Sequence, residues 1–157
     1  MPPKMVVDLS QVDLNHVEDD IEGIRKYNRQ RYEMELVTGI IKYDPSGGCV
    51  VAFKDTSADD FWVRGHIPGR PLMPGVLICE CAAQTCSYYY GRSTQQNRFL
   101  GFAGIDGVKF RGQVAPGDRL IMAARVLEVK SRISSFSCQG FVKGQMVFEG
   151  TINGVAL

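Results

Sequence analysis

The stretch from about residue 73 to residue 90 constrains the fold most, because it reads as one helix that is apolar on nearly every side. A helix that lacks a polar face is normally buried all round. One carboxylate, Glu80, stands inside it. Burial of an unpaired carboxylate is so unfavourable that the group either keeps its proton or finds a partner. The stretch therefore predicts a buried central helix, at about 73–90, with the rest of the chain wrapped around it.

The segments on both sides of this helix have the alternation and the turn residues of strands. Strand-like stretches cover 33–43 and 49–55 before the helix, and 99–111, 118–130, 132–142 and 145–154 after it. Pro, Gly, Asp and Ser mark the turns between several of them. Strands joined by such short turns run antiparallel. We therefore expect an α+β fold, with one antiparallel sheet around one helix.

A shorter amphipathic helix is predicted at about 15–28. Asn15 can cap this helix, and Val17, Ile21 and Ile24 make an apolar stripe. Its acidic residues come first and its basic residues last, which suits the helix dipole. No linker or internal repeat divides the 157 residues, so a single domain spanning 1–157 is expected.

Composition excludes several classes of protein. The net charge of +1 argues against a protein that coats nucleic acid. No apolar run reaches the ~18–20 residues of a membrane-spanning helix, and the N-terminus does not resemble a secretory signal. A cytoplasmic location is the default expectation. The five cysteines lack the spacing of a disulfide framework or a zinc site, so no metal site is predicted.

The loop before the central helix carries the candidate chemistry. His66 precedes Glu80 by fourteen positions, and prolines and glycines between them stiffen the loop and allow close backbone approach. The free N–H groups of Gly75 and Val76, at the positive end of the helix, can polarise a carbonyl oxygen. A histidine beside a carboxyl that favours its proton is the minimum equipment for acid–base catalysis near neutral pH. Taken singly, each has a plainer explanation: a structural histidine, and a glutamate paired with a lysine across a subunit interface.

Two stretches of the chain resemble one known family. Residues 65–84, GHIPGRPLMPGVLICECAAQ, resemble the signature of the FabZ-type (3R)-3-hydroxyacyl-acyl-carrier-protein dehydratases, G-H-F-P-G-x-P-x-x-P-G-V-L-x-x-E-x-x-A-Q. Residues 102–120, FAGIDGVKFRGQVAPGDRL, are similar to a second stretch of that family. The resemblance implies the hot-dog fold, in which the sheet wraps the central helix. It also implies an active site between the two protomers of a homodimer, with a trimer of dimers as the family habit, and no metal or other cofactor.

The resemblance further implies a role for each residue of the site. His66 is the general base that takes the proton alpha to the thioester, and Glu80 of the partner chain protonates the departing β-hydroxyl. The N–H of Gly75, next to that of Val76, binds the thioester oxygen as negative charge develops. The acyl tunnel is expected to involve Ile67, Leu77, Gly101 and Phe102. An acidic acyl carrier protein is expected to dock on basic residues near the tunnel mouth, with Arg64, Arg70, Lys109 and Arg111 as the candidates and Arg98 and Arg132 as further ones.

The sequence departs from the family pattern in ways that bear on the acyl group. Ile67 replaces the family phenylalanine, and Gly101 stands where an aromatic residue often gates the tunnel. A glycine there predicts a wider or looser tunnel. Two other functions remain open. An acyl thioesterase would use Glu80 to activate water, and a non-catalytic acyl-carrier-binding subunit would need neither polar residue.

Overall fold

The computed structural model describes residues 2–157. Among these residues the chain forms two α-helices, six β-strands and two short 3-10 helices, which follow one another in this order: the 3-10 helix Leu9–Gln11, α1 (Ile21–Arg25), the 3-10 helix Tyr32–Met34, β1 (Gly39–Asp44), β2 (Cys49–Asp55), α2 (Gly75–Thr94), β3 (Leu100–Phe110), β4 (Arg119–Val129), β5 (Ile133–Val142) and β6 (Gln145–Ala156).

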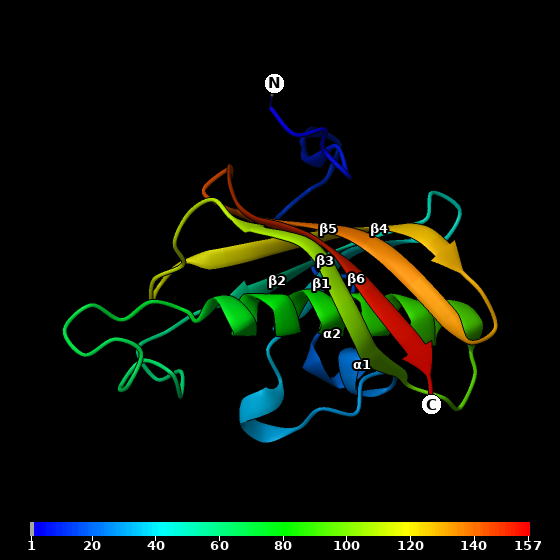
Figure 1. Cartoon of the computed structure of the whole chain (residues 1–157), viewed down its shortest axis with the longest axis horizontal. Helices are drawn as coiled ribbons and strands as arrows, with labels where there is room; N and C mark the ends of the chain where they lie inside the picture. The colour runs from blue at the N-terminus through cyan, green and yellow to red at the C-terminus, as the bar shows by residue number, and fades with distance from the viewer. Residues whose placement is uncertain (1) are drawn as a thin grey trace.

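The six strands form one antiparallel sheet in the order β1-β2-β4-β5-β6-β3. Figure 1 shows this sheet curving over α2, which runs along its concave side. The turns between β1 and β2, between β4 and β5, and between β5 and β6 are short, so these pairs are neighbours in the sheet. The helix α2 connects β2 to β3, which forms one edge of the sheet. The predicted hot-dog architecture is confirmed.

Apolar side chains fill both faces of the sheet. The larger cluster lies between the sheet and α2, and includes Tyr88 and Tyr90 of the helix, both at most 1% exposed. A smaller cluster on the outer face includes Val51 and Phe141 and is covered by the N-terminal residues 6–14. These residues lie above the sheet in Figure 1, on the side opposite α2. Because both faces are covered, β2 is apolar from Cys49 to Phe53 rather than alternating.

The prediction of a helix at 15–28 is largely wrong. Only Ile21–Arg25 is α-helical, and Asp20, not Asn15, caps it, its side chain accepting a hydrogen bond from the Gly23 N–H. The preceding residues form a turn at 14–15 and then an isolated bridge, in which Asp19 pairs with Ile40 of the edge strand β1. Tertiary hydrogen bonding to a strand edge therefore overrides the local helix signal.

The first predicted strand and the central helix also need correction. Residues 33–38 are not a strand, and the strand begins only at Gly39. The helix α2 begins at Gly75, because Pro74 before it is extended with a ψ of 137°, and it continues to Thr94. Its burial is not complete either, since Val76 in the first turn is 76% exposed. The other predicted strands agree with the structure to within one or two residues.

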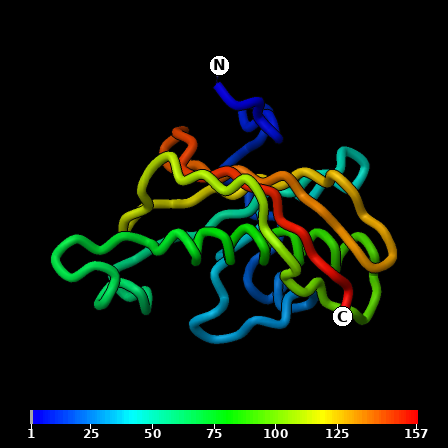
Figure 2. Tube along the Cα trace, viewed as in Figure 1, coloured from blue at the N-terminus to red at the C-terminus, as the bar shows by residue number. Residues whose placement is uncertain are grey.

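The long connection between β2 and α2, residues 56–74, contains no helix or strand. In Figure 2 this segment projects beyond the sheet at the N-terminal end of α2. It carries His66 and leads directly into the helix that carries Glu80. The fold thus places one candidate group on a loop and the other on a buried helix.

Candidate active site

Glu80 lies in the second turn of α2, and its residue is partly buried. Its carboxylate is not unpaired. The Oε1 atom accepts a hydrogen bond of 2.9 Å from the amide Nε2 of Gln84, one helical turn further on. Residues four apart lie on the same helix face, which makes this contact possible. The acid predicted from the sequence therefore has a defined orientation.

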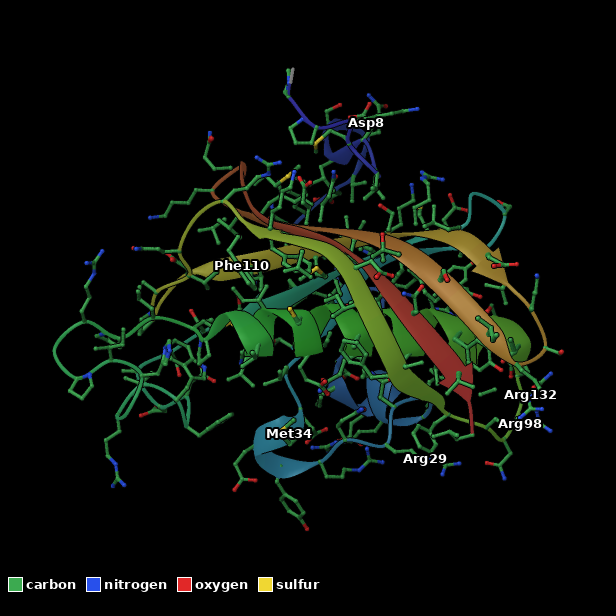
Figure 3. The ribbon with its side chains drawn as sticks, viewed as in Figure 1. Asp8, Arg29, Met34, Arg98, Phe110 and Arg132 are labelled. Carbon is green, nitrogen blue, oxygen red and sulfur yellow. The ribbon has the colours of Figure 1, made fainter. Side chains whose placement is uncertain are left out.

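Gln84 is buried, at 2% exposure, and both polar atoms of its side chain and its backbone carbonyl form hydrogen bonds. Its Oε1 accepts the N–H of Leu36 at 3.0 Å, and its Nε2 also donates to the carbonyl of Met34 at 2.7 Å. Its backbone carbonyl accepts from Asn28 Nδ2 at 2.9 Å. Figure 3 shows Met34 beneath α2, on the segment that faces the helix from the side opposite the sheet. The segment 28–36 thus fixes Gln84, and Gln84 fixes Glu80.

Glu80 also lines a pocket between α2 and the edge of the sheet. The helix contributes Ala83 and Ser87, which follow Glu80 at the spacing of one helix face. The remaining lining residues come from three other segments: Gln30, Phe99, Leu100, Gly101, Phe102, Ile152, Asn153 and Gly154. The pocket thus combines apolar residues with several polar ones, and Glu80 is the charged residue among those that line it.

His66 is exposed on the loop between β2 and α2. Its ring Nδ1 lies 2.8 Å from the carbonyl oxygen of Leu72. Because a carbonyl can only accept, Nδ1 carries the hydrogen and Nε2 of the neutral ring keeps a free lone pair. The ring is thereby oriented as a base at Nε2. Within residues 2–157, no hydrogen bond or ion pair joins His66 to Glu80.

The start of α2 offers two backbone donors. The N–H groups of Leu77 and Ile78 both bond to the Pro74 carbonyl, whereas those of Gly75 and Val76 make no hydrogen bond within the described part of the chain. Such groups at a helix N-terminus favour negative charge. A Cβ at Gly75 would lie only 2.7 Å from the Phe110 ring, so any other residue there would require this half-exposed ring to move.

The residues predicted to form the acyl tunnel are not gathered in one place. Gly101 and Phe102 line the Glu80 pocket, whereas Ile67 lies on the loop and is 50% exposed. Leu77 packs against the main core from the first turn of α2. A Cβ at Gly101 would lie 2.6 Å from Leu157 Cδ1, so position 101 faces the C-terminal residue and contributes only backbone to the pocket.

The basic residues predicted to dock a carrier differ in how they are engaged. Arg111 forms an ion pair with Glu149 at 2.9 Å, and Arg70 reaches Gln113 at 3.4 Å. Arg64 and Lys109 have no ion pair within residues 2–157 and are exposed. The further candidates Arg98 and Arg132 lie elsewhere: Figure 3 shows them with Arg29 at the opposite end of the molecule, near the end of α2.

Sequence reasoning missed the part that Gln84 plays. The signal was available, because a glutamine four residues after a buried glutamate on a helix predicts a side-chain contact. The contributions of Met34 and Leu36 could not be predicted, since their backbone groups meet Gln84 only through the tertiary fold.

The cysteines Cys79 and Cys81 point to different surroundings, with Cys81 fully buried and Cys79 partly exposed. Within residues 2–157, no helix is long and apolar enough to cross a bilayer.

Comparison with known proteins identifies the family of this chain. The model of the FabA-like domain matches residues 28–151, and the chain therefore belongs to the FabA-like family. The curated relatives identify the branch. The chain is 37% identical over 137 residues to the 3-hydroxyacyl-[acyl-carrier-protein] dehydratase FabZ of Lawsonia intracellularis, with 85% of this chain and 89% of that protein covered. It is 35% identical to FabZ of Teredinibacter turnerae, with 85% and 93% covered. The resemblance to FabZ-type dehydratases is confirmed.

Solved structures share the fold at much lower identity. The dehydratase heterocomplex ApeI:P from Xenorhabdus doucetiae superposes with a TM-score of 0.72 and 17% identity, over 85% of this chain and 90% of that one. Zebra fish thioesterase superfamily member 2 superposes with a TM-score of 0.64 and 12% identity, over 85% and 93%. These likenesses concern the fold alone, which hosts more than one chemistry.

Proposed function

We propose that this protein dehydrates (3R)-3-hydroxyacyl thioesters carried on acyl carrier protein to the trans-2-enoyl thioesters. The observation that carries the proposal is the oriented carboxyl of Glu80 at a pocket beside α2, combined with a loop histidine whose Nε2 is free. Curated relatives at 35–37% identity bear the name of that activity. Elimination of water needs one base and one acid, and the chain supplies both.

In the proposed reaction, His66 Nε2 removes the proton alpha to the thioester carbonyl. The electron pair of that C–H bond forms the new carbon–carbon double bond as the C3–O bond breaks. The Glu80 carboxyl gives its proton to the departing hydroxyl, which leaves as water. Negative charge on the thioester oxygen in the transition state is stabilised by the Gly75 N–H, with Val76 beside it, at the positive end of α2. Proton return from His66 to Glu80, directly or through water, resets the site.

The two acid–base groups come from different subunits of a homodimer in this proposal. Support comes from the absence of a His66–Glu80 contact within residues 2–157. The strand β3 is an open edge of the sheet and exposes Phe102 and Phe110, at 45% and 51%. An open strand edge presents unpaired N–H and C=O groups with which another chain can pair. An edge-to-edge dimer through β3 would cover both aromatics, of which Phe102 lines the Glu80 pocket.

Complementation between inactive variants tests the whole proposal. His66→Ala and Glu80→Gln should each lower kcat by about 10²–10⁴-fold, measured as enoyl absorbance in the ultraviolet from a 3-hydroxyacyl thioester. When the two variants are unfolded together and refolded, half of the dimers are mixed, and each has one intact shared site. Activity should then return to about a quarter of wild type, as expected for a two-fold symmetric interface.

Three results would count against the proposal. No recovery on mixing would place both groups in one chain. Wild type that forms no enoyl product at all would rule out the dehydratase. Release of free thiol, detected with a thiol reagent, would indicate a thioesterase instead.

Carrier docking is proposed for the basic residues near the His66 loop. Arg64 and Lys109 are the better candidates of the predicted set because no ion pair competes for them within the described residues. Charge reversal of Arg64 should raise KM for carrier-bound substrate but not for a short thioester without the carrier, since it removes only electrostatic attraction. The matched control is charge reversal of Arg98, at the other end of the molecule. A larger effect of the Arg98 variant would move the docking surface to that end.

A further inference from the structure

Lys54 is a buried charge that the proposed reaction does not use. It lies near the end of β2, its residue is 6% exposed, and its Nζ is 3.0 Å from Asp60 Oδ1. Lysine is almost never this buried unless it is paired. Asp60 is also fixed on its other oxygen, which accepts the N–H of Ser57 at 2.8 Å. The ion pair therefore ties the sheet to the first turn of the loop that carries His66.

A continuous series of contacts leads from this ion pair to the histidine. The Val63 N–H donates to the Asp60 carbonyl at 3.1 Å, which closes a turn around Trp62. Trp62 is 4% exposed and belongs to the main core. Its carbonyl accepts the N–H of His66 at 2.8 Å. The backbone of His66 is thus held on its N-terminal side by a turn that is anchored through one buried charge and one buried ring.

The C-terminal side of His66 is held differently. The His66 carbonyl accepts the Leu72 N–H at 2.9 Å, and the Met73 N–H donates to Val114 at 2.8 Å. These contacts are backbone hydrogen bonds between neutral groups. Among the ion pairs formed by residues 2–157, the Lys54–Asp60 pair is the one that holds the loop 56–74. Loss of that pair would free one side of His66 and leave the other in place.

We infer that Lys54 is a positioning residue for His66, acting through Asp60 and the Trp62 carbonyl. The inference rests on the proposed function, because it assigns His66 to the reaction. A loop without helix or strand would otherwise sample many positions, and a displacement of about 1 Å at a reacting group can lower a rate by about 10²-fold. Lys54 does not touch the substrate in this scheme. Its effect is on where the imidazole sits.

A double variant separates positioning from simple charge burial. Lys54→Met alone leaves the partly buried Asp60 carboxylate with the Ser57 N–H but without its counter-ion, and is expected to destabilise the fold. Lys54→Met combined with Asp60→Asn removes both charges but keeps an acceptor for the Ser57 N–H, so its thermal midpoint should return towards wild type. If Lys54 positions His66, kcat of the double variant stays about tenfold or more below wild type with KM unchanged. Amide hydrogen exchange across 57–72 should be faster than in wild type.

The matched control is the neighbouring ion pair from the same strand, Asp55 with Arg119 at 2.6 Å, which is exposed and lies outside the loop. Arg119→Met with Asp55→Asn should change neither kcat nor exchange in 57–72. The inference is overturned if the double variant of Lys54 and Asp60 has wild-type kcat, or if loop exchange and the His66 ring signal in NMR are unchanged. Because exchange and NMR need no substrate, their result stands even if wild type proves inactive as a dehydratase.

Discussion

Replacing Gln84 by methionine tests the support of the proposed acid most directly. Methionine has nearly the same length and flexibility and keeps the buried volume, but it donates no hydrogen bond. The substitution removes the donor to Glu80 Oε1, at 2.9 Å, and both contacts with segment 34–36. It leaves Glu80 on the same helix face with its side-chain rotamer no longer fixed.

The size of the effect follows from what is left unpaired. The Leu36 N–H becomes a buried donor without a partner, which costs about 1–3 kcal/mol. The Met34 carbonyl is only partly buried and can find water, so its loss is smaller. We expect the free energy of unfolding to fall by about 2–4 kcal/mol, which most domains survive. We expect kcat to fall by about 10–100-fold because the carboxyl is no longer aimed.

Urea unfolding and the enoyl absorbance assay measure these two effects separately. The matched control is Gln139→Met. Gln139 is also buried, at 4% exposure, and bonds to backbone groups of Val6 and Lys4 at 2.9 and 2.8 Å, but it lies on the outer face of the sheet. That variant should lose stability without losing kcat. If both variants keep the same kcat, Gln84 has only a structural part, and the orientation argument for Glu80 fails.

Three further outcomes are expected. Gly154→Ala should lower the free energy of unfolding by about 1–3 kcal/mol in urea, because the added methyl overlaps the side chain of Leu100 in the Glu80 pocket; an unchanged midpoint would contradict this packing. Glu35→Gln should lower the thermal midpoint at pH 7, because hydrogen bonding from Arg25 lowers the pKa of Glu35. That stabilisation is present above pH 4.5, the ordinary glutamate value, and is lost as the pH falls through the lowered pKa, so the two midpoints should converge in acid. Burial raises the pKa of the Cys81 thiol to about 12, so a thiol reagent at pH 8 should label it, by mass spectrometry, only after denaturant is added.

The central helix and the later strands could be predicted from the sequence because their signals are local. An apolar run around Glu80 has few alternatives to a buried helix, and Gly and Pro mark most strand ends. The segment 15–38 could not be predicted in the same way. Its acidic residues suit a helix N-terminus, yet Asp19 is used in pairing with Ile40, a contact that exists only once β1 has joined the sheet. The weak local preference of a few residues does not outweigh such pairing.

The residues of the candidate site also differ in whether a local sequence signal predicts them. His66 and Glu80 lie in one short stretch that several prolines and glycines make distinctive, so they could be identified from the sequence. Gln84 belongs to the same stretch, but its partners Met34 and Leu36 lie about fifty positions away in the chain. The burial of Lys54 is even harder to predict from the sequence, because a lysine at a strand end usually extends into solvent. Supporting residues depend on which segments the fold brings together, and one sequence does not contain that information locally.

The two proposed catalytic groups are held in unequal ways, and this bears on how a dehydratase of this kind works. Glu80 is fixed by a buried helix and by a glutamine that is itself bonded on every polar atom. His66 is on an exposed loop, held by backbone hydrogen bonds and by the Lys54–Asp60 pair. The β-hydroxyl and the alpha proton sit on adjacent carbons, so fixing the acid sets the place of the hydroxyl and leaves the base to reach the proton. Misplacement of either group costs rate, and in the wild-type protein the exposed loop gives the base more room to move than the helix gives the acid. In the proposed reaction the contacts that hold the loop therefore affect the rate, as do the groups that exchange protons.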